Sequence, residues 1–285
     1  MTTDTLAHNK TKIPARLGRL RNGSPQARGF FIQRTINMKY SQERIKPYAQ
    51  DGEKGQQVEL MFDRIAHSYD KLNHLFSMKI DKKWRSAAIA ALRPYRPGRI
   101  LDVATGTGDF AFLAAKELKP KEVVGIDFSE GMLKVGRQKA REMGLEAMVT
   151  FRREDCMDIS MEGGTFDAVM AAYGVRNFAD LEKGLGQMLR MLKPGGRMVI
   201  IELTTPGRFP MKQLFHLYSK VLMPAVGKIV SNDGSAYSYL LKTMDAFPQG
   251  AQMKGILEKV GFKDVVYRRF TFGISTLYTG CRPVE

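Results

Sequence analysis

Residues 100–109 read ILDVATGTGD, and this stretch decides the fold. A short apolar run ends at Asp102, a loop of small residues follows with glycines at 106 and 108, and residues 110–118 form an apolar, helix-like segment. This order predicts a strand, a tight turn and a helix. Glycine lacks Cβ, so a ligand can lie against the main chain beside the helix N-terminus. Because ligands of open α/β sheets bind at this end of the strands, we expect a nucleoside-containing cofactor here.

The loop by itself does not identify that cofactor. Gly106, Gly108 and Ala111 also fit the pattern G-x-G-x-x-A of dinucleotide-binding enzymes. An oxidoreductase is therefore the first rival interpretation, and the rest of the chain has to decide.

Apolar runs alternate with helical patterns along the following 100 or so residues. We expect helices over 131–143 and 181–192, and strands over 123–127, 148–151, 166–172 and 197–202. Such alternation predicts a parallel, doubly wound α/β sheet. Residues 265–270 and 274–281 look like two more strands without a helix between them, so the seven-stranded, mostly parallel sheet should finish with one antiparallel strand.

Helical patterns also flank the sheet. Apolar residues recur every three or four positions from Val58 to Phe76, and a second helix is expected from Asp81, as its N-cap, to Leu92. These two helices either cover the mouth of the cofactor site or simply pack against the sheet. A third helical segment, within an insertion at about 209–247, is either a packed helix, a lid over an apolar substrate or a helix on a membrane surface. Its apolar and basic positions are Leu214, Phe215, Leu217, Tyr218, Val221, Leu222 and Val226, with Lys212, Lys220 and Lys228.

Residues 1–37 differ from the rest of the chain. They hold seven lysines and arginines against one acid, which is +6 of the net charge of +16, and they lack hydrophobic periodicity. We expect a disordered basic tail. It is either a dispensable segment upstream of a true start at Met38, a mitochondrial transit peptide, or a basic arm for RNA or lipid.

Composition limits the partners. The excess of basic residues suggests a nucleic acid or an anionic membrane surface as a partner. No apolar run approaches the roughly 18 to 20 residues that span a bilayer. Two cysteines make no disulfide framework, and four scattered histidines predict no metal site. A reduced, cytosolic setting is expected.

Three acids favour one cofactor. Asp127, at the end of the second strand, is placed to accept hydrogen bonds from ribose hydroxyls, which either a nicotinamide cofactor or S-adenosylmethionine would need. Asp102 beneath the loop suits a cationic amino acid moiety, and Asp155 after the third strand suits an adenine amino group. A pyrophosphate would instead require bases and uncompensated amides. The acids therefore favour S-adenosylmethionine.

Several motifs resemble a known family. Residues 192–196, LKPGG, together with the glycine loop, resemble class I S-adenosylmethionine-dependent methyltransferases of Rossmann-like fold. Four further stretches closely resemble the ubiquinone/menaquinone biosynthesis C-methyltransferases, and the resemblance covers about residues 56–282. These stretches are 62–73 (FDRIAHSYDKLN), 173–177 (YGVRN), 223–228 (MPAVGK), and 238–240 (SYL) with Phe247-Pro248.

The patterns along the chain imply a domain plan, and the resemblance implies an activity. The plan is a tail over 1–37, an N-terminal helical cap over 38–98, and a methyltransferase domain over 99–285. The activity is methyl transfer from S-adenosylmethionine to a ring carbon of a polyprenyl quinol, demethylmenaquinol first. The alternatives are the C-methylation step of ubiquinone biosynthesis, both steps, or another substrate such as RNA.

The resemblance also implies site residues. For the cofactor it carries over Thr107, Asp127, Asp155 and Cys156. With the loop and the acid beneath it, the full cofactor-contacting set is Asp102, Ala104, Gly106, Thr107, Gly108, Asp127, Asp155 and Cys156. The candidate catalytic residues are Arg176, Asn177 and Tyr69. Two positions depart from the family pattern: Ala172 stands where many relatives have serine, and Asp81 precedes Trp84 where relatives often carry histidine. A histidine-base mechanism should therefore not be transferred to this chain.

The chemistry needs no protein nucleophile. A sulfonium methyl is already activated, so the enzyme has to make the accepting carbon electron-rich, which deprotonation of a quinol hydroxyl achieves. We expect Arg176 to stabilise the phenolate, directly or through a water that takes the proton, and Asn177 to orient the ring.

The basic core then predicts peripheral, salt-sensitive association with an anionic membrane, on the cytoplasmic side in a bacterium or in the mitochondrial matrix if residues 1–37 are a transit peptide. A homodimer is a further prediction. A nucleic-acid methyltransferase is disfavoured because no Asn-Pro-Pro-Tyr-like motif follows the fourth strand and no RNA-binding module is recognisable. A non-catalytic basic membrane or RNA-binding protein is the last rival.

Overall fold

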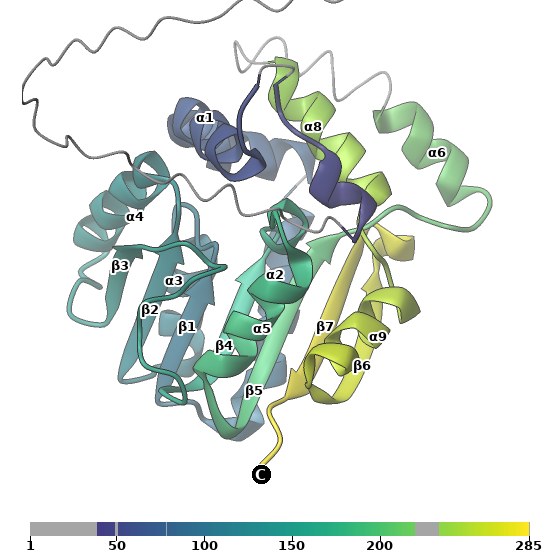
Figure 1. Cartoon of the computed structure of the whole chain (residues 1–285). Coiled ribbons are helices and arrows are strands. Elements are labelled where there is room, and N and C mark those ends of the chain that lie inside the picture. The colour runs from purple at the N-terminus through teal and green to yellow at the C-terminus, as the bar shows by residue number, and fades with distance from the viewer. Residues whose placement is uncertain (1–38, 49–50, 78, 220–233, 285) are drawn as a thin grey trace, which may run out of the picture. The chain divides into compact units, whose positions relative to one another are not determined.

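A seven-stranded sheet in the order β3-β2-β1-β4-β5-β7-β6 organises the computed structural model (Figure 1). The structure describes residues 39–48, 51–77, 79–219 and 234–284, within one compact unit formed by Ile36–Glu285. The strands are β1 (Arg99–Val103), β2 (Glu122–Asp127), β3 (Val149–Arg153), β4 (Phe166–Ala172), β5 (Leu192–Leu203), β6 (Lys263–Phe270) and β7 (Ser275–Cys281). β7 alone runs antiparallel to both of its neighbours, β5 and β6. The predicted seven-stranded mixed sheet is confirmed.

Helices cover both faces of this sheet. One face carries α2 (Ile80–Leu92), α3 (Asp109–Leu118) and α4 (Glu130–Glu142), and the other carries α5 (Leu181–Met191) and α9 (Ala251–Val260). Successive residues of a strand point to opposite faces of the sheet, so they pack alternately against the two helical layers. Ile100 packs in the cluster with α2 and α3, whereas Leu101 packs in the cluster with α5 and α9.

A third group of helices lies over the carboxyl ends of the parallel strands (Figure 1). These are α1 (Lys54–Phe76), α6 (Met211–Leu217) and α8 (Gly234–Ala246), with the 3-10 turns η1 (Ser41–Arg44) and η3 (Val175–Asn177). Met61 and Ile65 of α1 pack with Met132 of α4 and Tyr239 of α8 in a separate apolar cluster. The chain therefore roofs the end of the sheet where the strand-to-helix loops meet.

The second helix begins one residue earlier than predicted, so the prediction of Asp81 as its N-cap was wrong. Lys79 occupies the cap position in a left-handed conformation, with φ of 62°. Asp81 lies in the first turn, where Arg85, one turn later on the same helix face, donates to its carboxylate over 2.6 Å.

β5 also begins earlier than expected, at Leu192 rather than Arg197. Phe166 pairs with Leu192 and Ala168 with Arg197, so the KPGG residues bulge out of register within the strand. Gly195 has φ of 74°, which glycine adopts readily, and its amide donates to the Arg282 carbonyl over 3.1 Å.

The insertion forms α6 and α8, while residues 220–233 lie outside the described part of the chain. The apolar and basic positions predicted at 220–228, and the tail over 1–37, therefore lie outside it too. In the ranges that the structure describes, no helix combines the length and hydropathy that crossing a bilayer requires. The same ranges contain no group of three or more potential metal ligands.

Candidate functional site

The loop after β1 has the unusual backbone that its sequence predicts. Ala104, Gly106 and Gly108 have φ of 54°, 57° and 84°. The Gly106 amide donates to Asp127 Oδ2 over 2.8 Å, and the Ser129 amide donates to Asp127 Oδ1 over 2.9 Å. Asp127 thus joins the ends of β1 and β2.

A cavity of about 110 Å³, here called the cofactor cavity, lies at this loop. It is bounded by the carboxyl ends of β1, β2 and β4, the segment after β3, and α1. Its lining includes Tyr69, Ala104, Gly106, Asp127, Phe128, Met132, Asp155, Cys156, Met157, Gly174 and Asn177. Five of the eight predicted cofactor-contacting residues therefore meet around one space.

Asp102 and Thr107 lie on the other side of the loop, in a smaller cleft that shares Tyr69, Ala104 and Gly106 with the cofactor cavity. Asp102 is fully buried and accepts from Thr105 Oγ1 over 2.6 Å. Its other oxygen, Oδ1, has no hydrogen-bond partner among the described residues. Burial raises the pKa of Asp102 to about 7, against the opposing effects of Thr105 and Arg85.

Gly108 has a packing role instead of a lining role. A Cβ on this residue would lie 2.6 Å from Cζ of Phe151 and 2.9 Å from Cε2 of Phe112. The missing side chain therefore lets the loop pack closely on β3 and α3.

A hydrogen-bonded network ties α1 to the loop. Thr107 Oγ1 donates to Asp70 Oδ1 over 2.5 Å. Lys139 of α4 bridges Asp70, at 2.9 Å, and Asp109 of α3, at 2.5 Å. Thr107 thus fastens the helix that roofs the cofactor cavity.

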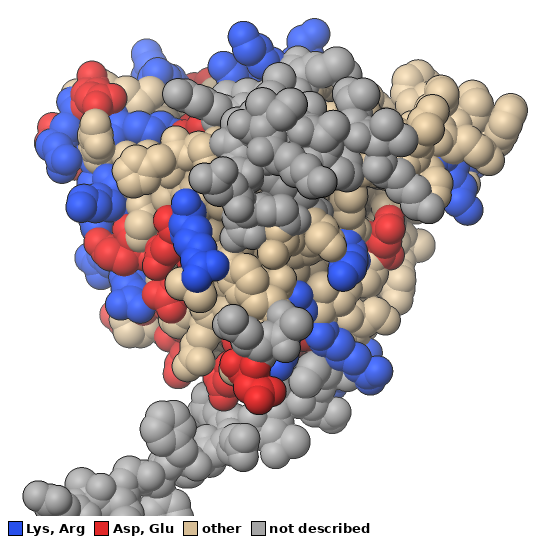
Figure 2. Space-filling view, turned by 90° about the horizontal axis from the view of Figure 1, so that it is seen from above, with Lys and Arg blue, Asp and Glu red and all other residues tan. Residues whose placement is uncertain are grey.

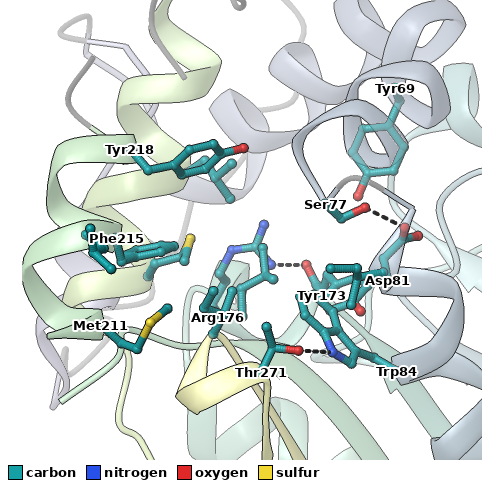
Figure 3. A pocket seen from close by; sticks show the side chains of 16 residues that line it. Tyr69, Ser77, Asp81, Trp84, Tyr173, Arg176, Met211, Phe215, Tyr218 and Thr271 are labelled. Carbon is teal, nitrogen blue, oxygen red and sulfur yellow. Dashed lines mark hydrogen bonds between the residues drawn. The ribbon is translucent and has the colours of Figure 1, made fainter. Parts of the chain in front are cut away.

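A second, larger cavity of about 250 Å³ lies beside the first under α1, α6 and α8 (Figure 3). We call it the apolar cavity. It is lined by Tyr69, Ser77, Ile80, Asp81, Trp84, Tyr173, Arg176, Leu203, Met211, Leu214, Phe215, Tyr218, Leu240, Met244, Thr271 and Ile274. Among the described residues of this lining, only Asp81 and Arg176 carry charged side chains.

Arg176 is anchored at the end of β5. Its Nη1 donates to Glu202 Oε1 over 2.6 Å and to the Tyr173 carbonyl, and its amide donates to Glu202 Oε2 over 3.1 Å. Burial, the largest single effect, opposes the charge of the guanidinium, but Glu202 together with Tyr69 and Tyr239 raises the pKa of Arg176. The result is a fixed positive charge on the wall of the apolar cavity.

The three candidate catalytic residues lie around the boundary between the cavities. Tyr69 lines both, Arg176 lines the apolar cavity, and Asn177 lines the cofactor cavity. Asn177 Oδ1 is buried without a partner among the described residues. Consecutive residues of η3 therefore serve different cavities.

Comparison with known proteins agrees with this geometry. A model of the ubiE/COQ5 methyltransferase family matches residues 50–282. The chain belongs to this family. It is a methyltransferase of the S-adenosylmethionine-dependent class.

Two curated relatives of the family illustrate the match. A demethylmenaquinone methyltransferase from Bacteroides fragilis is 56% identical over 245 residues, which cover 86% of this chain and all of the relative. A ubiquinone/menaquinone biosynthesis C-methyltransferase from Geobacter sulfurreducens is 42% identical over 229 residues, covering 80% and 89% of the two chains.

Solved structures share the fold at low sequence identity. The crystal structure of the [4+2]-cyclase SpnF has a TM-score of 0.60 at 16% identity, covering 81% of this chain and 97% of that one. An S-adenosylmethionine-dependent methyltransferase from Thermotoga maritima, a possible histamine N-methyltransferase, has a TM-score of 0.57 at 16% identity, with coverage of 79% and 99%. At this identity the likeness supports the class I methyltransferase fold alone.

Several residues of the site were not anticipated from the sequence. Glu202 ends an apolar run at the carboxyl end of β5, the same signal that identified Asp127, and could have been found that way. Trp84 is the only tryptophan of the chain and donates to Thr271 Oγ1 over 2.9 Å on the cavity wall. No local pattern indicated that Met244 or Thr271 would line the same cavity.

Proposed function

We propose that this protein transfers a methyl group from S-adenosylmethionine to a ring carbon of a polyprenyl quinol, with demethylmenaquinol as the first substrate. The observation that carries the proposal is the pair of adjoining cavities that share Tyr69. The cofactor cavity is bordered by acids at strand ends, and the apolar cavity has one fixed cation, Arg176, in its described lining. A sulfonium donor and a lipid-tailed ring acceptor need two such spaces side by side.

The residues present fit the cofactor. The carboxylate of Asp127 serves the ribose hydroxyls, Asp155 the adenine amino group, and the unpartnered Oδ1 of Asp102 the ammonium of the methionine moiety. When bound, S-adenosylmethionine supplies a methyl group that is already activated.

The protein's task is to activate the acceptor. When the quinol hydroxyl loses its proton, Arg176 stabilises the phenolate oxygen, and the charge delocalises to the neighbouring ring carbon. The apolar walls keep bulk water away, which strengthens this interaction. Asn177, on the cofactor side of the boundary, orients the ring toward the donor.

The names of the relatives favour menaquinone biosynthesis. The 56% identical relative from Bacteroides fragilis is named for demethylmenaquinone alone, and the more distant relative from Geobacter sulfurreducens is named for both quinones. The ubiquinone precursor is therefore the second candidate substrate.

The protein should also adsorb peripherally to an anionic membrane, where such a quinol resides, on the cytoplasmic side of a bacterial cell. Phe209, Leu214 and Leu217, in or next to α6, are 82%, 55% and 62% exposed, and the β6–β7 turn adds Phe272 at 76%. Leu214 also lines the apolar cavity. Figure 2 shows α6 as a mostly uncharged protrusion with basic side chains at its base. These features support adsorption with the cavity facing the lipid; the homodimer stays a prediction.

The decisive test is transfer of a labelled methyl group from S-adenosylmethionine to chemically reduced demethylmenaquinone, with the oxidised quinone and a ubiquinol precursor alongside. We expect label in the reduced demethylmenaquinone and none in the oxidised form. Label in both quinols means a dual-specificity enzyme. Label in neither, with cofactor bound, rejects the proposed substrate.

A further inference from the structure

We infer that Asp81 selects the reduced form of the ring substrate against its oxidised form. The inference rests on the proposed function and assigns a specificity role to a residue outside the candidate catalytic trio. It starts from the two charged side chains in the described lining of the apolar cavity, which have opposite sign: Asp81 on α2 and Arg176 on η3.

The two side chains impose opposite hydrogen-bonding requirements. A guanidinium can only donate hydrogen bonds, and a carboxylate can only accept them. A ring held between them therefore has to present an acceptor to Arg176 and a donor to Asp81. The rest of the cavity wall is mainly aromatic and aliphatic, and water competes weakly there.

Asp81 is held firmly in this position. The residue is 3% exposed; Ser77 Oγ donates to its Oδ1 over 2.5 Å and Arg85 Nη1 to its Oδ2 over 2.6 Å. Arg85 is itself fixed over the Tyr173 ring, 5.1 Å from the centroid. A carboxylate can accept up to about four hydrogen bonds, so a bond from a ligand can add to those that Asp81 receives from the protein. Figure 3 shows Asp81 at the cavity wall below the Tyr69 ring.

A quinol and a quinone meet this pair differently. A quinol carries two hydroxyls in para positions: one becomes the phenolate that accepts from Arg176, and the other keeps its proton and donates to Asp81. A quinone carries two carbonyls, which only accept. Bound in the same place, one carbonyl would face the carboxylate with no proton between them, in a cavity where an unsatisfied polar contact is costly.

The expected discrimination is large. Sites built to hydrogen-bond a substrate hydroxyl reject analogues that lack the donor by up to about 10⁴-fold. The tail is the same in both forms, so its contribution cancels in the ratio of their affinities. From the ring contacts we expect at least about 100-fold tighter binding of the quinol. The selection would keep the unreactive quinone of the membrane from occupying the site.

Trp84 provides the measurement. As the only tryptophan of the chain, it lies on the wall of the apolar cavity, so its fluorescence reports occupancy directly. The full chain, saturated with S-adenosylhomocysteine, would be titrated with short-tailed demethylmenaquinone in oxidised and in anaerobically reduced form. Half-saturation concentrations would be compared, because quenching amplitudes differ between the two forms.

The measured quantity is the half-saturation concentration of the quinone divided by that of the quinol. Asp81→Asn, whose amide can donate to a carbonyl, should lower this ratio at least about tenfold, chiefly by tightening quinone binding. Asp81→Glu, which keeps the acceptor, should retain preference for the quinol. If Asp81 served only to position Arg85, its substitution would weaken binding of the quinol and the quinone alike and leave the ratio unchanged. Asp245→Asn is the matched control, since Asp245 is exposed on neighbouring α8 and bonded to Thr205.

An unchanged ratio in Asp81→Asn, or equal binding of both forms by the unaltered protein, overturns the inference. The equal-binding outcome does not depend on whether any variant folds. Methylation of the quinol together with either result rejects the role of Asp81 and keeps the proposed function. Absence of both binding and methylation rejects the two together.

Discussion

Arg176 and Glu202 form a buried ion pair, with 2.6 Å between Nη1 and Oε1 and side chains that are 6% and 0% exposed. The pair joins η3 to the carboxyl end of β5 and fixes Arg176, the only cation in the described lining of the apolar cavity. Activity and stability therefore depend on the same contact, and experiments on Arg176 have to separate them.

Arg176→Ala should lower kcat about 100-fold or more, since stabilisation of a developing oxyanion by one donor is commonly worth about 3 to 4 kcal/mol. Cofactor affinity, measured by calorimetry, should stay near normal because Arg176 does not line the cofactor cavity. Near-normal turnover would remove Arg176 from the mechanism.

The Arg176→Ala variant also leaves Glu202 buried without its partner, which costs about 3 to 5 kcal/mol of stability. The double variant Arg176→Met with Glu202→Gln should recover stability without recovering turnover.

Asp127→Asn should weaken binding of S-adenosylhomocysteine at least about tenfold. The amide keeps the shape of the side chain but loses the charge-assisted acceptor for ribose hydroxyls, which is worth roughly 1.5 to 3 kcal/mol. Isothermal titration calorimetry measures the change. Unaltered affinity in a folded variant would mean that the ribose binds elsewhere.

Asp102 gives stability a pH dependence. Burial raises its pKa to about 7, so the folded protein holds a proton that the unfolded chain has lost above its ordinary value near 3.8. The contribution of this group to stability is full below about pH 4 and is lost as the pH rises through 7. Relative to Asp102→Asn, the cofactor-free protein should lose about 2 to 3 kcal/mol between pH 5 and pH 8. Thermal melts across this range test the expectation, and parallel curves would contradict it. The variant should also bind the cofactor more weakly.

Gly108→Ala should destabilise the protein by at least about 2 kcal/mol, because alanine disfavours the left-handed backbone and its methyl would overlap Phe151. Gly255→Ala is the control: this glycine is exposed within α9, a Cβ there meets nothing within 4 Å, and alanine should stabilise the helix by up to about 1 kcal/mol. Denaturant unfolding compares the two. Equal effects would refute the close-packing explanation.

Leu217→Asp should reduce sedimentation with anionic liposomes several-fold, because burial of a leucine in lipid is worth about 1.5 to 3 kcal/mol. Raising the salt concentration should release the unaltered protein, since each basic side chain near the surface contributes about 1 kcal/mol. Val284→Asp, which changes a 78% exposed residue near the opposite end of the sheet, is the control. Binding that ignores both salt and Leu217 would argue against adsorption through α6.

Features set by local sequence were predictable. The strand-loop-helix pattern at residues 100–109, the acid at the end of β2 and the final antiparallel strand all follow from hydrophobic periodicity and turn chemistry, which act over a few residues. These features fixed the fold and the carboxyl end of the sheet as the site. Asp127 and Asp155 could be placed there because parallel strands end at a common edge.

Contacts between distant segments were not predictable in the same way. Arg176 and Asn177 were expected to act together, but the 3-10 turn η3 rotates successive side chains by about 120° and directs them into different cavities. Asp81 read as a helix cap because the sequence does not reveal that Arg85 and Ser77 would hold it in a cavity wall. The apolar cavity itself is assembled from α1, α2, α6, α8 and the β6–β7 turn, whose proximity depends on the whole fold.

Tyr69 borders the cofactor cavity, the cleft at Asp102 and the apolar cavity. A side chain shared in this way makes the two ligands thermodynamically interdependent. Any displacement of the ring that improves the fit of one ligand alters the space offered to the other, and the resulting coupling is reciprocal: each ligand changes the affinity of the other by the same factor. The affinity of the site for its quinol is therefore not a single constant but depends on whether the methylated or the demethylated form of the cofactor is present.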